Sequence, residues 1–197
     1  MSTEPQIRAV WGRTVLRRRA SFTPDESRAW NERVSSARVA RVTSAFPMQW
    51  LPASDVLGLV DVSEAVLGPR YVSTGLEHLL EELGRPPYAA ILRGIAHSGH
   101  QDPRAGVAAA IEVLFATICR NAGSMVVEVT GDHGLEIWHR APAREFVQSP
   151  GYRLAFSYVS LATLAVVGLD GDSQGFVPAG DDLVCPVTRI RPRPAAS

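Results

Sequence analysis

The chain has 197 residues, of which 46% are apolar and 20% charged, a composition typical of a folded globular domain and not of a disordered chain. Its 20 basic and 20 acidic side chains balance, so no net charge draws the chain to nucleic acid or to an anionic membrane. The length favours a single domain over residues 1–197, and only the ends, about 1–5 and 192–197, are expected to be disordered.

All 20 basic side chains are arginine, and the absence of lysine excludes several kinds of active site. The chain has no lysine for a P-loop, for a Schiff base or for a serine–lysine dyad. Its two cysteines, Cys119 and Cys185, belong to no C-x-x-C pair, which argues against a zinc knuckle. Because the N-terminal sequence MSTEPQIRAV has no apolar signal region, we expect a cytoplasmic protein with reduced thiols.

The first part of the chain has the pattern of successive helices separated by proline and glycine. Residues 7–20 mix β-branched residues with arginine and predict a strand or an irregular arm. A capping box of Thr23 and Glu26 then starts a helix that is expected to reach about Arg41. Further helices are expected at about 53–67, 70–83, 87–98 and 103–121. In the last of these, four apolar residues recur at the spacing of a buried face: Val107, Ile111, Leu114 and Ile118.

After Gly123 the pattern of apolar residues changes. Two short alternating runs, Met125–Thr130 and Leu135–Arg140, flank a glycine-containing turn and predict a hairpin. The uncharged run from Leu154 to Leu169 is too short to span a bilayer, so we expect no membrane contact and a buried helix over about 152–167. A last alternating run, 182–192, predicts a strand.

This order of elements predicts an α+β fold. An N-terminal helical part, about 23–122, is expected to pack on a small antiparallel sheet. The sheet belongs to a C-terminal part, about 123–192, in which strand, strand, buried helix and strand follow one another.

Two histidines near the end of the 87–98 helix raise the question of a metal site. His97 and His100 lie three residues apart, so on a continuous helix both rings would share a face. Gly99 lies between them and is expected to end the helix, with Asp102 capping the next one. We therefore expect no metal. The alternative is a metal-dependent enzyme that uses His97, His100 and His133.

The remaining candidates are aromatic and basic side chains. Trp138, Phe156 and Tyr158 are the residues we expect to line a ligand pocket between the sheet and the helices, although aromatic residues more often fill a core. A basic cluster, Arg13, Arg17, Arg18 and Arg19, would suit phosphate contact, but a run of three arginines is too short for a basic block, so nucleic acid is not the expected partner.

Several short motifs, taken with the order of elements, resemble a known group of proteins. Trp50-Leu51-Pro52 leads into a helix ending at Leu67-Gly68, and a long helix ends in Arg120-Asn121-Ala122-Gly123 before the hairpin. Over about residues 8–192 this pattern resembles the paralogous families of unknown function that are abundant in myxobacteria. Their fold is similar to that of haem nitric-oxide-binding and vinyl-reductase-type ligand-binding domains. The resemblance implies helices packed on an antiparallel sheet, with a cavity used for sensing or protein contact.

The resemblance does not extend to haem. Haem-binding members hold the propionates with a Tyr-x-Ser-x-Arg signature, and the nearest strings here, at 71–75 and 158–162, lack the arginine. The vinyl-reductase-like members often carry a C-terminal cysteine or histidine cluster, whereas Cys185 stands alone. We therefore expect no cofactor.

The leading hypothesis from the sequence is a non-enzymatic, cytoplasmic regulatory or protein-interaction module, for which a homo-oligomer is also conceivable. The first alternative is a small-molecule sensor with an apolar cavity between the 152–167 helix and the hairpin. The second is the metal-dependent enzyme. The expected partner is accordingly a protein or a small apolar ligand.

Overall fold

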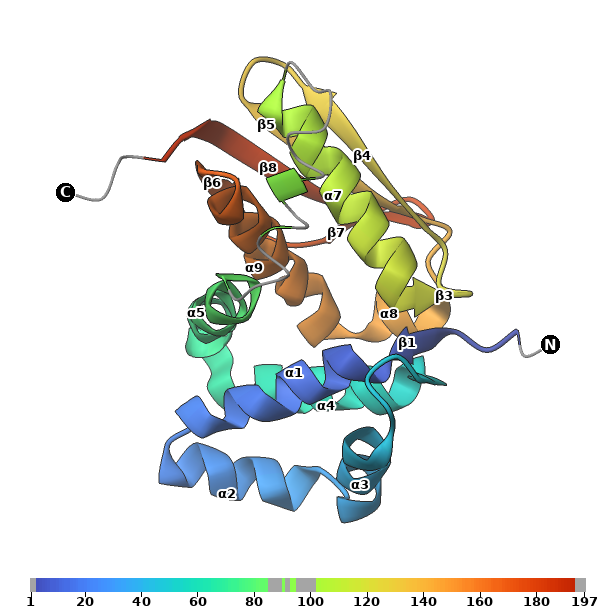
Figure 1. The fold of residues 1–197 in the computed structure, drawn as a ribbon. Helices are drawn as coiled ribbons and strands as arrows, with labels where there is room; N and C mark the ends of the chain where they lie inside the picture. The colour runs from blue at the N-terminus through green and yellow to red at the C-terminus, as the bar shows by residue number, and fades with distance from the viewer. Residues whose placement is uncertain (1–2, 85–89, 91–92, 95–101, 194–197) are drawn as a thin grey trace.

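The computed structural model describes residues 3–84, 90, 93–94 and 102–193 (Figure 1). Six helices of the described residues precede the hairpin: α1 (Ala9–Arg18), α2 (Pro24–Arg33), α3 (Ser36–Ser44), α4 (Ala53–Leu67), α5 (Tyr71–Gly84) and α7 (Pro103–Ile118). Short 3-10 turns follow α1 at Arg19–Ser21 and α4 at Gly68–Arg70. The expected helices at 53–67, 70–83 and 103–121 are thereby confirmed to within three residues. Most of the expected 87–98 helix, with His97, Gly99 and His100, lies outside the described residues.

Two of the helix starts follow the predicted capping. The Thr23 hydroxyl accepts a hydrogen bond from the Glu26 amide at 3.2 Å, and the Glu26 carboxylate accepts one from the Thr23 amide at 2.7 Å. The Asp102 carboxylate accepts a hydrogen bond from the Arg104 amide at 2.8 Å at the start of α7.

The structure corrects two expectations in the N-terminal part. Residues 7–20 form a strand only at β1 (Gln6–Arg8) and continue as α1. The reason is a buried face with helical spacing, Ala9, Gly12, Val15 and Arg18, which the β-branched residues obscured. The single helix expected from Thr23 to Arg41 is two helices, because Val34 is extended and the Ser35 side chain caps α3.

The C-terminal part forms an antiparallel sheet with the order β4-β5-β8-β6, and β7 pairs with β8. Its strands are β4 (Ser124–Thr130), β5 (Gly134–Arg140), β6 (Leu169–Ser173), β7 (Val177–Ala179) and β8 (Asp182–Pro192). The register places Met125 opposite His139 and Ile137 opposite Cys185. The hairpin and the last strand agree with the sequence pattern, whereas β6 and β7 were not predicted.

A second, three-stranded sheet ties the N-terminus to the middle of the chain. Its order is β2 (Trp50–Pro52), β1 and β3 (Cys119–Arg120), all antiparallel. Ile7 is paired with both Leu51 and Cys119. This sheet was not predicted, because two or three residues are too few for an alternating pattern to be visible in the sequence.

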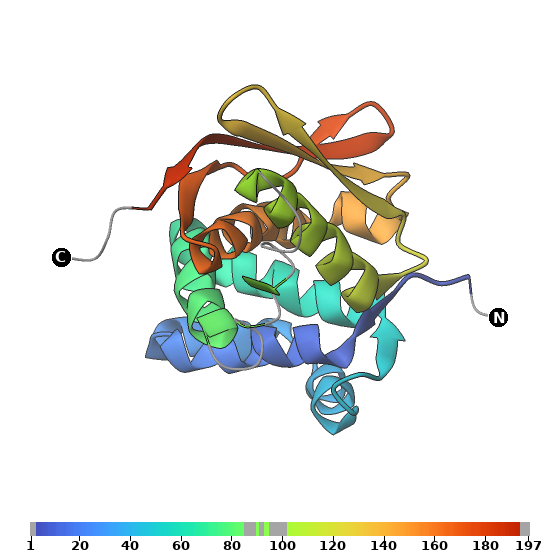
Figure 2. The ribbon, with the colours of Figure 1, turned by 45° about the horizontal axis from the view of Figure 1, so that its top comes forward.

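The helices lie on one face of the larger sheet (Figure 2). α7 and α9 (Pro150–Val166) pack against the strands, and α9 also packs against α4 and α5, so it is buried on several sides. A short helix, α8 (Arg144–Gln148), precedes α9. Along β5, Leu135, Ile137 and His139 are buried beneath the helices. The α+β class with antiparallel sheets is therefore confirmed.

The buried helix expected over 152–167 is α9. Within the described part of the chain, no helix is both long and apolar enough to cross a bilayer.

Candidate functional site

The structure does not gather a metal site from the histidines that it describes. His97 and His100 lie outside the described residues. His133 is exposed in the turn between β4 and β5, where its backbone carbonyl accepts a hydrogen bond from the Ile190 amide at 3.0 Å. Among residues 3–84, 90, 93–94 and 102–193, no three His, Cys, Asp or Glu side chains lie close enough together to hold a metal ion.

The three aromatic residues expected to line one pocket lie in three different places. Trp138 is on the face of β5 opposite to Ile137 and His139, because neighbouring strand residues point to opposite faces. The Arg140 guanidinium covers the Trp138 ring at 3.9 Å. Phe156 lies in the core between α9 and the sheet, whereas Tyr158 faces α1 and α5. The structure therefore does not bring these side chains together as walls of one cavity.

An aromatic cluster surrounds His139 between α9 and the sheet and is made of Phe115, Phe146, Tyr152, Phe156 and Phe176. The His139 ring lies edge-on to Phe115 at 5.0 Å and to Phe146 at 5.5 Å between ring centres. Phe156 and Phe176 lie 4.4 Å apart. A cavity of about 40 Å³ adjoins this cluster and is lined by Phe115, Phe146, Tyr152 and Phe156.

Both ring nitrogens of His139 have partners. Nε2 lies 2.7 Å from the Ala122 carbonyl, and Nδ1 lies 2.9 Å from the Tyr152 hydroxyl. A neutral ring that donates from Nε2 and accepts at Nδ1 satisfies both contacts. Burial lowers the pKa of His139 to about 4, so this neutral form persists at pH 7. His139 is thus a fully partnered core residue.

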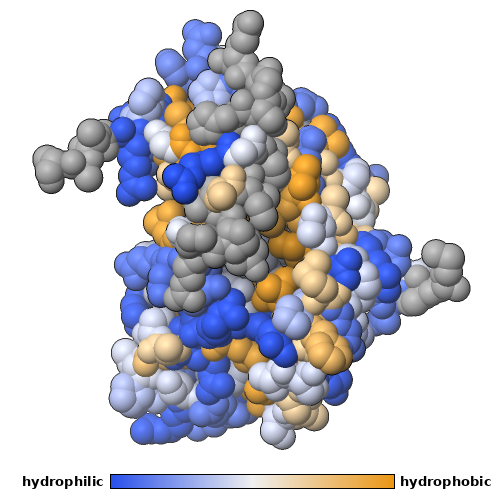
Figure 3. Space-filling model, in the orientation of Figure 1, coloured by the Kyte–Doolittle hydropathy of each residue, from blue (hydrophilic) through white to orange (hydrophobic). Residues whose placement is uncertain are grey.

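The strongest candidate for a binding site is a groove of about 410 Å³ between α1, α5, α7 and α9. Most of its lining is apolar and includes Val10, Trp11, Leu79, Leu83, Leu114, Ile118, Val159, Pro47 and Met48. Figure 3 shows hydrophobic side chains gathered between α7 and α1 on this side of the molecule. Its volume lies in the range of small-molecule pockets, about 300–1,000 Å³. The described residues thus provide a groove of suitable size and polarity for a small apolar molecule.

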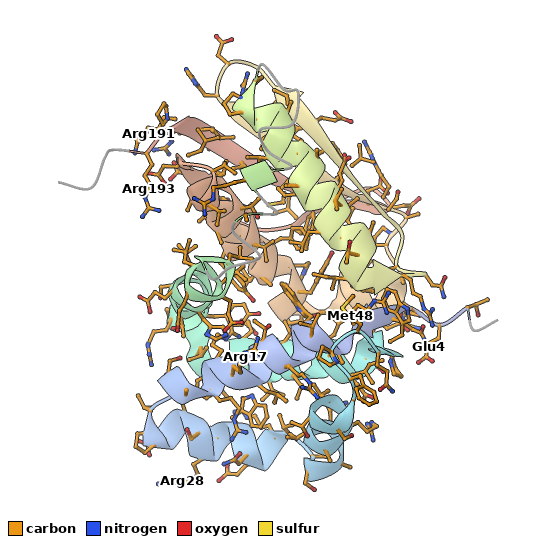
Figure 4. The ribbon with its side chains drawn as sticks, viewed as in Figure 1. Glu4, Arg17, Arg28, Met48, Arg191 and Arg193 are labelled. Carbon is orange, nitrogen blue, oxygen red and sulfur yellow. The ribbon has the colours of Figure 1, made fainter. Side chains whose placement is uncertain are left out.

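The charged groups of the groove lie near the two ends of α1, at Arg8 and Arg17, and at the end of α5, at Glu82. Arg17 donates to the Glu82 carboxylate at 2.7 Å and so links α1 to α5. Arg8 donates to the Met48 carbonyl and covers the Trp50 ring at 3.7 Å. Figure 4 shows Arg17 and Met48 toward opposite ends of α1. Arg17 is therefore paired with a carboxylate, whereas Arg8 is held by a carbonyl and an aromatic ring.

A smaller cavity, of about 40 Å³, adjoins the groove and shares Trp11, Leu114, Ile118 and Val159 with it. Cys119 lines this cavity, and burial raises the pKa of its thiol to about 12. The thiolate is the nucleophilic form of cysteine, so Cys119 is unreactive at neutral pH.

Arg18 is the most unusual polar residue beside the groove. It is 3% exposed, and its guanidinium carbon lies 4.5 Å from the centre of the Tyr71 ring. Its Nη1 lies 3.5 Å from the Tyr158 hydroxyl, whereas its buried Nε and Nη2 have no hydrogen-bond partner. No carboxylate of the described residues forms an ion pair with it.

This burial is costly for a charged group. An unpaired ion in a protein interior costs several kcal/mol even after relaxation. The C-terminus of a helix such as α1 stabilises a cation in its last turn by about 0.3–1 kcal/mol, and an aromatic face stabilises a cation by about 0.5–2 kcal/mol. These two effects offset only part of the cost, so the environment of Arg18 is incomplete as it stands.

The other members of the basic cluster contact their own chain and do not form one exposed face. Arg13 donates to the Thr43 carbonyl at 2.7 Å, and Arg19 donates to the Asn31 side chain at 2.7 Å. Arg19 also covers the Trp30 ring at 3.9 Å. The arrangement offers no continuous surface for phosphate groups.

Sequence reasoning missed Trp11, and it named Arg18 only as part of an exposed basic cluster, because residues 7–20 were not recognised as a helix. Leu114 and Ile118 were expected on a buried face; both are only partly buried, and both line the groove. A helical-period test of residues 9–18 would have placed Arg18 on the same face as Ala9, Gly12 and Val15.

The chain was compared with protein-family models, curated proteins and solved structures, and nothing in any of the three comparisons matches it.

Proposed function

We propose that this protein is a non-enzymatic ligand-binding module that holds a small apolar molecule in the groove between α1, α5, α7 and α9. The observation that carries this proposal is the groove of about 410 Å³ with its mostly apolar lining from four helices. The proposal keeps the idea of a small-molecule sensor but moves its site away from the hairpin. The resemblance to ligand-binding families remains a proposal of the same kind and favours the same function.

A neutral fluorescent dye, Nile red, tests this proposal without a known ligand. We expect saturable binding of one dye per chain, because the groove offers one apolar site of suitable size. Leu114→Gln places an amide in the groove and should weaken dye binding about tenfold, the usual effect of changing one apolar pocket contact. Val113→Gln is the matched control, because Val113 is an exposed residue of the same helix outside the groove.

The two variants decide the outcome. Equal dye affinity in Leu114→Gln and the wild type, or an equal loss in both variants, would show that the dye binds elsewhere. A chemical denaturation curve for each variant separates loss of binding from loss of folding.

Protein contact is a second candidate function, and the loop before β2 supports it. Phe46 is 80% exposed and Met48 is 53% exposed, an uncommon position for two large apolar side chains. Because the chain has no net charge, repulsion between copies is weak, so we propose a second copy of this chain as the partner. Light scattering over a concentration series should show dimers that Phe46→Ser reduces. A constant monomer mass would contradict this proposal.

We also propose that the protein acts in the cytoplasm, where both thiols would stay reduced. Cys119 and Cys185 form no disulfide.

A further inference from the structure

We propose that the small cavity beside Arg18 binds a monovalent anion of about the size of chloride. The cavity has a volume of about 20 Å³ and is lined by Trp11, Thr14, Val15, Arg18, Gly75, His78, Leu79 and Tyr158. A single water molecule needs about 10–15 Å³, so the space suits one compact ion. This site is independent of the dye-binding groove, although the two share Trp11, Thr14 and Leu79.

The chemistry of Arg18 requires an acceptor. A guanidinium group carries only donors, and two of its nitrogens, Nε and Nη2, are buried without a partner. A water molecule would satisfy these donors but would leave the buried charge uncompensated. An anion does both, since it accepts the hydrogen bonds and neutralises the charge.

The surrounding groups do not supply that negative charge. The side chain of Arg18 makes one hydrogen bond, from Nη1 to the Tyr158 hydroxyl at 3.5 Å, and this hydroxyl is uncharged. Glu82, one helical turn beyond His78 on α5, accepts a hydrogen bond from Arg17 at 2.7 Å. His78 lines the cavity, and its buried Nε2 also has no partner. His78 therefore forms part of the wall of the cavity, and Arg18 is the donor to the anion.

Gly75 makes the space for this site. A Cβ atom at Gly75 would lie 2.6 Å from the Tyr158 ring and 3.0 Å from Arg18 Nη1. Glycine destabilises the interior of a helix, so a glycine within α5 needs a specific reason. The close approach of Arg18 and Tyr158 supplies that reason. The cavity thus combines a buried cation, an unpartnered histidine nitrogen and a backbone position without a side chain.

Thermal unfolding of the full chain tests the proposal. Sodium gluconate is exchanged for sodium chloride at constant ionic strength, so that general screening does not change. We expect the Tm to rise with chloride by several degrees and to saturate, because a ligand bound only by the folded state stabilises it. Bromide should act in the same way. Arg18→Met should remove the chloride dependence, whereas Arg28→Met, at an exposed arginine, should retain it.

A second measurement covers the case in which Arg18→Met does not fold. A crystal of the wild type soaked in bromide should give an anomalous peak beside Arg18. The proposal is overturned if chloride and gluconate give the same Tm, if the chloride effect persists in Arg18→Met, or if bromide is absent from this cavity. In each of these cases the cavity holds water only.

Discussion

His139 and Arg18 are both basic side chains buried among aromatic rings, but they differ in their hydrogen bonds. Each ring nitrogen of His139 lies within 2.9 Å of an oxygen, and burial keeps the ring neutral. Arg18 makes one side-chain hydrogen bond, at 3.5 Å, and leaves two nitrogens without hydrogen-bond partners. The first environment is complete within the chain, whereas the second lacks an acceptor.

This difference separates a structural polar group from a candidate binding group. A buried polar network that is fully satisfied stabilises one packing of the core, so His139 needs no ligand to explain it. An unsatisfied buried donor is uncommon in native proteins and needs a specific explanation, which an anion supplies for Arg18. The comparison can be tested by disturbing each region and measuring the free energy of unfolding.

The largest effect is expected from Phe146→Ala in the aromatic cluster. Phe146 is fully buried and packs against His139 at 5.5 Å and Tyr152 at 4.9 Å. Removing a buried phenyl ring costs about 3–5 kcal/mol, because it loses apolar burial and leaves a cavity. Urea denaturation measures this loss. Phe46→Ala is the matched control, because Phe46 is 80% exposed and should change stability by less than about 0.5 kcal/mol.

Titration of His139 should make the protein less stable in acid. Its pKa falls from 6.5 to about 4 on folding, so between these values the unfolded chain binds a proton that the folded chain does not. Stability is therefore complete above pH 6.5 and declines as the pH falls toward 4, by about 3 kcal/mol.

Denaturation at pH 7 and pH 4 measures this decline, and His139→Gln isolates the part due to His139. Burial also lowers the pKa of His78, which adds a change of the same sign, whereas burial raises the pKa of Asp61, which acts in the opposite direction. The wild-type difference should exceed that of His139→Gln. Equal pH dependence in the two proteins would show that His139 is not the group responsible.

The sequence was sufficient to predict the strands and the helix around His139, but not the contacts that His139 makes. Hairpin, α9 and β8 follow from alternation and from an uncharged run, so the sheet and its covering helix were expected. The role of His139 was not expected, because its contacts with Ala122 and Tyr152 depend on how β5 packs against two other segments. A strand pattern shows which residues share a face but not which distant groups meet there.

The region around Arg18 was less predictable. A buried arginine is rare, so residue type alone assigns Arg18 to the surface with Arg17 and Arg19. Arg18 is buried because α1 packs against α5 and α9. This packing brings Arg18 to Tyr71 and Tyr158, which are more than fifty positions away in the sequence. For the same reason Trp138, Phe156 and Tyr158 were grouped from their chemistry and their positions in neighbouring elements, although the structure separates them.

Removing one tyrosine hydroxyl beside His139 and another beside Arg18 compares the two regions directly. The expected losses of stability are of intermediate size. Tyr152→Phe leaves Nδ1 of buried His139 without a donor, which should cost about 1–3 kcal/mol. Tyr158→Phe removes the contact at 3.5 Å to Arg18, which lies at the outer limit of a hydrogen bond and should cost less than about 1 kcal/mol. Urea denaturation of both variants in the same buffer compares the two values. A larger loss for Tyr158→Phe would mean that its hydroxyl, and not an anion, is the main partner of Arg18.

The smallest effect is expected from the ion pair between Arg17 and Glu82 beside the groove. Its atoms lie 2.7 Å apart, but the Arg17 side chain is 48% exposed, so water and salt weaken the attraction. A double-mutant cycle with Arg17→Gln and Glu82→Gln should give a coupling free energy of about 0.2–1 kcal/mol that decreases in high salt. The exposed pair of Arg28 and Asp25, at 3.3 Å, is the control and should show less coupling.

Because Arg17 is bonded within the protein while Arg18 lacks an acceptor, only the Arg18 region should respond to chloride in a saturable way. A saturable chloride response that disappears in Arg17→Gln would assign the anion to Arg17 instead.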